Sequence, residues 1–187
     1  MAKSEKPVLL ALLRGINVGG NKLVDMKQLA TLATKAGYAN AKTYINSGNL
    51  MFRTSEPRAK VEATLEKAIE KHFGFSVDVV VRTQDEWEAY AKKSGFPEIE
   101  ATRAKMLLLG VTKQPVAKGA AEALNAIAKD GERVKAIKDA LWIDYGESLG
   151  RSKLTPAALD KNVGSPVTGR NWNTVLKLAE LMRELPE

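Results

Sequence analysis

The sequence has 187 residues, enough for one compact domain or two small ones that share a core, with 44% hydrophobic and 27% charged residues. This composition is ordinary for a soluble globular protein, and the absence of cysteine excludes disulfides and thiolate chemistry. No apolar run approaches the roughly 18 residues that a membrane helix needs, and the N-terminal MAKSEK lacks signal-peptide architecture, so we expect a cytoplasmic protein.

The net charge of +7 is unevenly placed along the chain. Residues 1–53 carry eight Lys and Arg against two acids, and residues 148–177 carry five against one. These two segments are also the richest in Gly and Asn, so the sequence predicts a basic surface near both. A solvated basic face with no partner is the alternative.

The stretch Val8–Lys22 predicts a strand followed by a ligand-binding loop. Its first six residues, Val8–Leu13, are all apolar, as is typical of a strand buried on both faces. The loop is basic at both ends, through Arg14 and Lys22, and its glycines permit a close approach of the backbone to an anion. The alternative is a connection whose glycines only satisfy turns. The glycines are Gly15, Gly19 and Gly20.

The first half of the chain predicts the element order β-α-β-β-α-β, which is the ferredoxin-like arrangement. A capping box of Asp25 and Gln28 begins the first helix, and Pro57 begins the second, which Gly74 ends. Residues 1–82 therefore form the first predicted subdomain. Its expected strands are Val8–Leu13, Lys42–Ile45, Leu50–Arg53 and Phe75–Arg82, and its first helix is Asp25–Ala36.

Residues 83–102 are predicted to connect this subdomain to a second one at 103–187. Thr83 and Glu86 form a capping box for a short connecting helix, and Thr155 is expected to cap another. The second half repeats β-α-β-β-α without a predicted final strand, because Gly146–Arg170 looks irregular. Its expected elements are a strand at Lys105–Val111, a helix at Pro115–Lys129, a hairpin of Glu132–Ile137 and Ala140–Tyr145, a short helix at Thr155–Lys161 and a last helix from near Asn173.

Residues suited to catalysis are few. His72 is the only histidine and is expected to be an ordinary helix residue, and without cysteine no His/Cys metal cluster can form. Asp144 is the nearest carboxylate candidate for a metal, but no D-x-D cluster accompanies it, so we predict no metal and no cofactor. Neither G-x-G-x-x-G nor the Walker pattern occurs in the glycine loop. Whether the protein is an enzyme stays open, and no catalytic residue is predicted.

Three polar motifs remain, and each has a structural alternative. Ser47-Gly48-Asn49 can make a turn or donate to a ligand. Ser152-Lys153-Leu154 places a cation beside a hydroxyl, and Gly169-Arg170-Asn171-Trp172-Asn173 runs into the last helix. Arg, Asn and an aromatic residue at a helix N-terminus make a good anion-binding corner, although the same Asn can simply cap and the Trp can simply pack.

The segments LLRGINVGGNK, YINSGNLMF, GRSKLT and GRNWNTVLKLAEL together resemble the bacterial family called domain of unknown function 1697. The resemblance covers nearly the whole chain and implies an α+β protein with two related subdomains. It implies no activity and no catalytic residues.

From these patterns we predict a soluble α+β protein with two ferredoxin-like subdomains. It is expected to bind an anionic, phosphate-bearing small molecule or nucleotide in a basic cleft between them. A nucleic-acid-binding module and a structural or partner-binding protein are the alternatives; no membrane partner is expected, and the oligomeric state is undetermined. The predicted ligand-binding residues are Arg14, Gly15, Asn17, Gly19, Gly20, Ser47, Asn49, Lys153, Arg170, Asn171 and Asn173.

Overall fold

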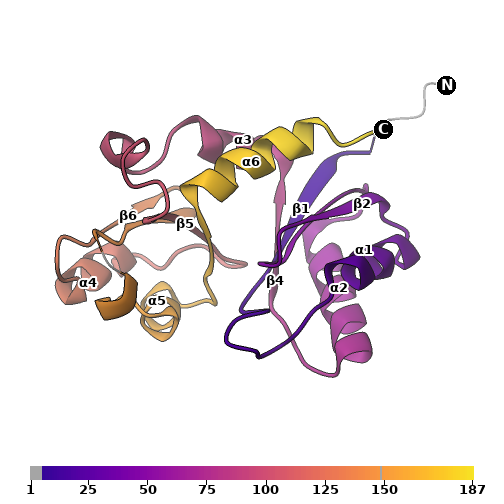
Figure 1. Ribbon diagram of the computed structural model, residues 1–187, viewed down its shortest axis with the longest axis horizontal. Helices are drawn as coiled ribbons and strands as arrows, with labels where there is room; N and C mark the ends of the chain where they lie inside the picture. The colour runs from indigo at the N-terminus through magenta and orange to yellow at the C-terminus, as the bar shows by residue number, and fades with distance from the viewer. Residues whose placement is uncertain (1–5, 148) are drawn as a thin grey trace. The chain divides into compact units, whose positions relative to one another are not determined.

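The structure is a computed structural model that describes residues 6–147 and 149–187, and it divides into two compact units (Figure 1). The first unit contains the described chain up to Glu88 together with Leu178–Glu187. The second unit contains Ala89–Lys177. Within the described residues, no helix is both long enough and apolar enough to cross a membrane.

The first unit has a four-stranded antiparallel sheet in the order β2-β3-β1-β4, as in a ferredoxin-like fold. Hydrophobic residues on one sheet face pack with α1 and α2, forming a core that includes Leu9, Leu29 and Leu65. Figure 1 shows both helices on that side of the sheet. The elements are β1 (Val8–Leu13), α1 (Met26–Lys35), β2 (Ala39–Tyr44), β3 (Asn49–Arg53), α2 (Arg58–Phe73) and β4 (Val79–Thr83).

The central strand β1 is buried along its whole length, as its unbroken apolar run predicts. Leu9 and Leu13 face the helix-covered core, whereas Leu10 and Leu12, on the opposite face, are also fully buried. The ends of α1 also agree with the sequence. The Asp25 side chain accepts a hydrogen bond from the Gln28 N–H, and Gly37 follows the helix with φ 91°.

The second unit repeats the same topology, with strand order β6-β7-β5-β8, so two ferredoxin-like subdomains are confirmed. The sequence predicts no final strand in this half, but β8 completes the sheet beside β5. Strand β8 is short and polar, TGRN, so it carries none of the apolar alternation that identifies a strand. The elements are β5 (Leu107–Val111), α4 (Ala120–Ile127), β6 (Arg133–Ile137), β7 (Ala140–Asp144), α5 (Pro156–Val163) and β8 (Thr168–Asn171).

Helices α3 (Gln84–Lys92) and α6 (Trp172–Arg183) each follow the last strand of a subdomain. The Thr83 hydroxyl accepts from the Glu86 N–H, and the Glu86 carboxylate accepts from the Thr83 N–H, so the predicted capping box is present. At the corresponding position before α6, the Asn171 side chain accepts from the Thr174 N–H. Two short 3-10 helices, η1 (Pro97–Ile99) and η2 (Leu149–Arg151), complete the described elements.

The two units also match position by position within their sheets. In the first sheet, Leu10 lies opposite both Met51 and Arg82. In the second sheet, Leu109 lies opposite both Trp142 and Arg170. Arg82 and Arg170 therefore occupy equivalent places in their fourth strands, and both are buried. This correspondence supports the hypothesis of an internal duplication, for which the sequence offered element order alone.

Candidate functional site

The loop Arg14–Lys22 is a tightly turned segment, exposed from Val18 onward and anchored by the buried Ile16, in which several residues have positive φ. A short bridge joins Val18 to Asn21, and the Asn17 N–H donates to the Lys22 carbonyl. The Lys22 ammonium reaches across to the Ser76 carbonyl, at 2.8 Å. The exposed backbone thus belongs to a loop that is held in place by hydrogen bonds of Asn17 and Lys22. The positive-φ residues are Gly15, Asn17, Gly19, Gly20 and Lys22.

Asn17 holds this loop to its neighbours. Its Nδ2 donates to the Val24 carbonyl at 3.0 Å and to the Asn46 carbonyl at 2.9 Å, while its Oδ1 accepts from the Val24 N–H at 2.8 Å. These bonds use both protons of the amide nitrogen. Asn17 is therefore a positioning residue, although it also lines an open hollow of about 620 Å³ together with Gln28, Asn46 and Phe73.

The Ser47-Gly48-Asn49 motif forms the turn between β2 and β3. Asn49 is fully buried, and its Nδ2 donates to the Tyr44 carbonyl at 2.9 Å and to Ser47 Oγ at 3.0 Å. Gly48 has φ 81°, and a Cβ there would lie 2.7 Å from Leu13 Cβ, so no larger residue fits. The described contacts of this motif thus favour its turn-making alternative.

The last motif also has strong structural roles. Asn171 caps α6 through its Oδ1, and Trp172 is buried with its ring centroid 5.7 Å from that of Trp142. Arg170 is buried and donates to the Gly169 carbonyl at 2.8 Å. Burial lowers the pKa of Arg170 to about 10, so its guanidinium still carries its charge at neutral pH. Asn173, by contrast, is exposed on the first turn of α6.

The Ser152-Lys153-Leu154 motif makes a local turn. The Ser152 hydroxyl accepts from the Leu154 N–H at 2.9 Å, while Lys153 is exposed. Leu154 is buried in the core of the second unit. Lys153 therefore lies on the surface beside an anchored leucine.

Asn173 lines a hollow of about 530 Å³ at the N-terminus of α6. The same hollow is lined by Arg103 and Lys105, which lead into β5, and by Glu147, which follows β7. Neither cation is among the predicted ligand-binding residues. Arg103 lies just before the predicted strand Lys105–Val111, and Lys105 begins it. They reach this hollow because β5 and β8 are neighbours and β8 leads directly into α6. The other lining residues are Ala101, Thr102, Ala104, Met106 and Gly146.

An ion-pair network fixes Arg103 at this hollow. Asp144 is fully buried, and its Oδ2 accepts from Arg103 at 3.0 Å and from Arg133 at 2.8 Å. Its Oδ1 accepts from the Gly146 N–H at 2.9 Å. The hydrogen bond to Asp144 raises the pKa of Arg133 above its usual range. Asp144, the carboxylate considered for a metal, thus binds two guanidinium groups.

The predicted site residues divide between the two units. The first unit holds Arg14, Gly15, Asn17, Gly19, Gly20, Ser47 and Asn49, and the second holds Lys153, Arg170, Asn171 and Asn173. In the first unit, the Asn17–Asn46 bond joins the glycine loop to the turn before β3. In the second, Asn171 and Asn173 lie on either side of Trp172 at the start of α6. The convergence of all eleven on one ligand stays a prediction.

His72 and the hydroxyl of Tyr145 are the remaining groups of interest for acid–base chemistry. The exposed His72 has its Nε2 3.0 Å from Gln28 Oε1, as expected of a helix surface residue. Tyr145 is buried and donates to the Leu154 carbonyl at 3.2 Å. Among the described residues, no group of three or more His, Asp and Glu side chains is placed to hold a metal ion.

Tyr145 makes stability sensitive to alkaline pH. Burial, reinforced by the charge of Glu132, raises its pKa to about 12 from the 10.0 of an ordinary tyrosine. The unfolded chain loses this proton first, so the stabilising contribution is complete below pH 10 and is lost as the pH rises through 12. We expect the protein to lose about 2–3 kcal/mol more than Tyr145→Phe across this window. Urea unfolding of both proteins at a series of pH values checks this, and parallel losses would contradict it.

The fold and these contacts define an α+β protein built from two ferredoxin-like subdomains, each with a fourth strand that leads into a helix. Residues 7–142 match the model of the family described as protein of unknown function (DUF1697), and the chain belongs to this family.

The chain is also similar in structure to the conserved bacterial protein SP0830 from Streptococcus pneumoniae. The TM-score is 0.71 at 22% sequence identity, over 94% of this chain and 98% of that one. At this identity the likeness shows the fold alone. A comparison with curated proteins gave no match.

Proposed function

We propose that this protein binds an anionic, phosphate-bearing small molecule or nucleotide, and that the anion occupies the hollow at the N-terminus of α6. The observation that carries the proposal is the meeting of Arg103, Lys105 and Asn173 around one space of about 530 Å³. Two cations and an amide are the groups that bind phosphate oxygens through charge-assisted hydrogen bonds. The twelve-residue helix α6 adds the partial positive charge of its N-terminus.

Arg103 is suited to hold a bound anion in a fixed position in this site. Its Nη2 is held by the buried Asp144, and its Nε is buried without a hydrogen-bond partner among the described residues. The planar group is thus fixed at one end before any ligand arrives, which reduces the entropy lost on binding. Lys105 is exposed and supplies a second positive charge at the hollow.

Glu147 lowers the net positive charge of the hollow, and it offers a direct test of whether the hollow prefers anions or cations. If an anion binds there, the Glu147 carboxylate opposes it, and neutralising that carboxylate should strengthen binding. If a cation binds there, the same change should weaken binding. The sign of this single effect therefore separates the two kinds of ligand.

The experiment is isothermal titration calorimetry of the full chain with pyrophosphate. We expect Lys105→Ala and Asn173→Ala each to weaken binding about tenfold, as loss of one hydrogen bond to a charged group does, and Glu147→Gln to strengthen it several-fold. Lys161→Ala, an exposed lysine on α5, is the matched control and should leave the affinity unchanged. Equal losses for Lys105→Ala and Lys161→Ala would contradict the site.

The small-molecule proposal is favoured over nucleic-acid binding by the character of the central strands. Sheet-based RNA binders stack bases on exposed aromatic residues of the sheet. Here β1 and β5 have the sequences VLLALL and LLLGV, which contain no aromatic residue. Both strands are also almost wholly buried.

A further inference from the structure

Hydrogen bonds to side chains, or a shift in pairing register, limit strand pairing on or beside three of the four edge strands. On β4, the N–H groups of Val79 and Val81 donate to the carboxylates of Glu66 and Glu62, at 2.8 and 2.9 Å. Just before β8, the Val167 N–H donates to Asp160 in the same way. On β2, the pairing register with β3 shifts between Ala39 and Lys42. Such devices prevent another strand from joining a sheet.

The edge strand β6 is blocked at one residue. The Asn125 side chain, on α4, accepts from the Val134 N–H and donates to the Val134 carbonyl, both at 2.8 Å, as a neighbouring strand would. The register of β6 with β7 runs unbroken from Arg133 to Ile137. Since outward-pointing backbone groups recur every second residue, the N–H and carbonyl of Ala136 also point away from β7.

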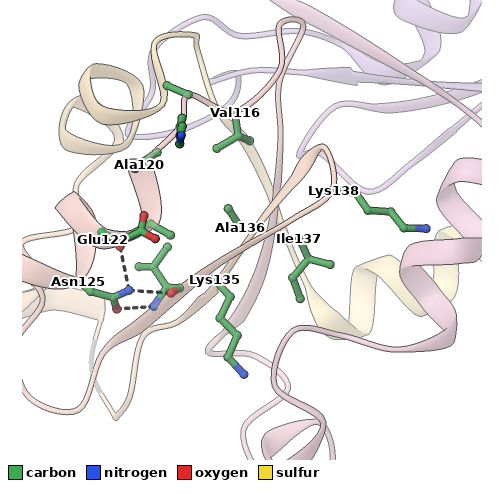
Figure 2. A pocket seen from close by; sticks show the side chains of 13 residues that line it. Val116, Ala120, Glu122, Asn125, Lys135, Ala136, Ile137 and Lys138 are labelled. Carbon is green, nitrogen blue, oxygen red and sulfur yellow. Dashed lines mark hydrogen bonds between the residues drawn. The ribbon is translucent and has the colours of Figure 1, made fainter.

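Among the described contacts, no α4 side chain is bonded to the backbone of Ala136 as Asn125 is bonded to that of Val134. One turn before Asn125, α4 carries Ala121, whose side chain has no hydrogen-bonding group. A hollow of about 440 Å³ lies here instead, between α4 and β6. Figure 2 shows Val116 and Ala120 on one side of it and Ala136 and Ile137 on the other. The outward-pointing backbone groups of Ala136 on β6 therefore lie at this hollow.

We propose that β6 binds an extended acidic peptide segment, which adds to the sheet at Ala136 and places an apolar side chain in the hollow. Main-chain pairing supplies affinity in such strand addition, and the pocket for alternate side chains supplies specificity. Val116, Ala120 and Ala136 supply the apolar part of the pocket wall for that side chain.

The charge of the rim selects an acidic partner. Lys118 and Lys138 are exposed at this hollow, where Glu122 is the one carboxylate among its lining residues. A third lining lysine, Lys135, is already engaged, because its ammonium donates to the Gly95 carbonyl and lies 4.4 Å from the Phe96 ring centroid. A second copy of β6 would bring like charges together across the new pairing, which is unfavourable.

The test is a titration of the ¹⁵N-labelled full chain with an acetylated, amidated heptapeptide of alternating Glu and Val. At saturation we expect hydrogen exchange of the Ala136 amide to slow at least tenfold. Lys138→Glu should weaken binding about tenfold, whereas Lys129→Glu, an exposed lysine beyond α4, should not change it. Ala136→Pro should abolish binding while the protein stays folded by circular dichroism, since proline is tolerated where an edge N–H faces outward.

Three results would overturn the proposal. The first is unchanged exchange at Ala136 in millimolar peptide. The second is equal binding of the matching Lys and Val peptide, which would show that charge does not select the partner. The third is a peptide-free dimer, measured by sedimentation, that protects Ala136 in the wild type and dissociates in Ala136→Pro, because a second copy would then be the occupant.

Discussion

Asp144→Ala is expected to lower the free energy of unfolding by about 3 kcal/mol, because it removes the buried anion that Arg103 and Arg133 share. The Asp144 side chain is fully buried and binds Arg103, Arg133 and the Gly146 N–H. Both arginines are partly exposed, so water recovers some of the loss and the effect stays below that of a wholly enclosed pair. Urea unfolding, read as a shift in midpoint at constant slope, measures it.

Glu98→Ala is the matched control for this prediction. Glu98 also binds Arg133, at 2.8 Å, but its side chain is 54% exposed. Ion pairs in contact with water contribute little, so the midpoint should scarcely move. Equal shifts for Asp144→Ala and Glu98→Ala would show that burial does not set the importance of this network.

Asn17→Ala is expected to lower the free energy of unfolding by about 2–3 kcal/mol, since it removes three hydrogen bonds that join separate segments. The change also leaves the N–H of the buried Val24 without its acceptor and puts alanine at φ 55°. Asn17→Gly relieves the backbone strain but restores no bond, so it should recover only a part of the loss. Urea unfolding together with hydrogen exchange at the Val24 amide measures both effects.

Asn21→Ala is the control within the same loop. Asn21 is exposed, and its backbone N–H, which the substitution keeps, donates to the Val18 carbonyl. The variant should therefore unfold close to the wild type. A loss as large as that of Asn17→Ala would mean that the loop tolerates no change at all and that the specific bonds of Asn17 are not what matters.

Much of the fold could be predicted because local chemistry and tertiary structure agree. The apolar run of β1 indicates a strand buried on both faces, and the caps at Asp25, Thr83 and Thr155 begin the helices that they predict. Gln28 departs in part from the predicted capping box with Asp25, because its side-chain oxygen contacts His72. Strand β8 could not be predicted, since its four residues owe their place to pairing with β5 rather than to their own pattern.

The site was harder to predict than the fold, for a physical reason. Asn, Ser and Gly use the same groups to bind ligands and to form turns, and the sequence alone does not show which of the two a given residue does. Asn17, Asn49 and Asn171 are engaged in bonds that hold loops and a helix end. Arg103 and Lys105 were missed because they belong to no polar motif, and only the pairing of β5 with β8 brings them to α6.

The most direct test of the proposed anion site is a pyrophosphate titration of the ¹⁵N-labelled protein, followed in two-dimensional NMR spectra. We predict saturable shifts centred on the Asn173 side-chain amide and on the backbone of residues 102–105. Shifts that are spread over exposed lysines and grow linearly with concentration, or that are confined to the loop Arg14–Lys22, would contradict this prediction.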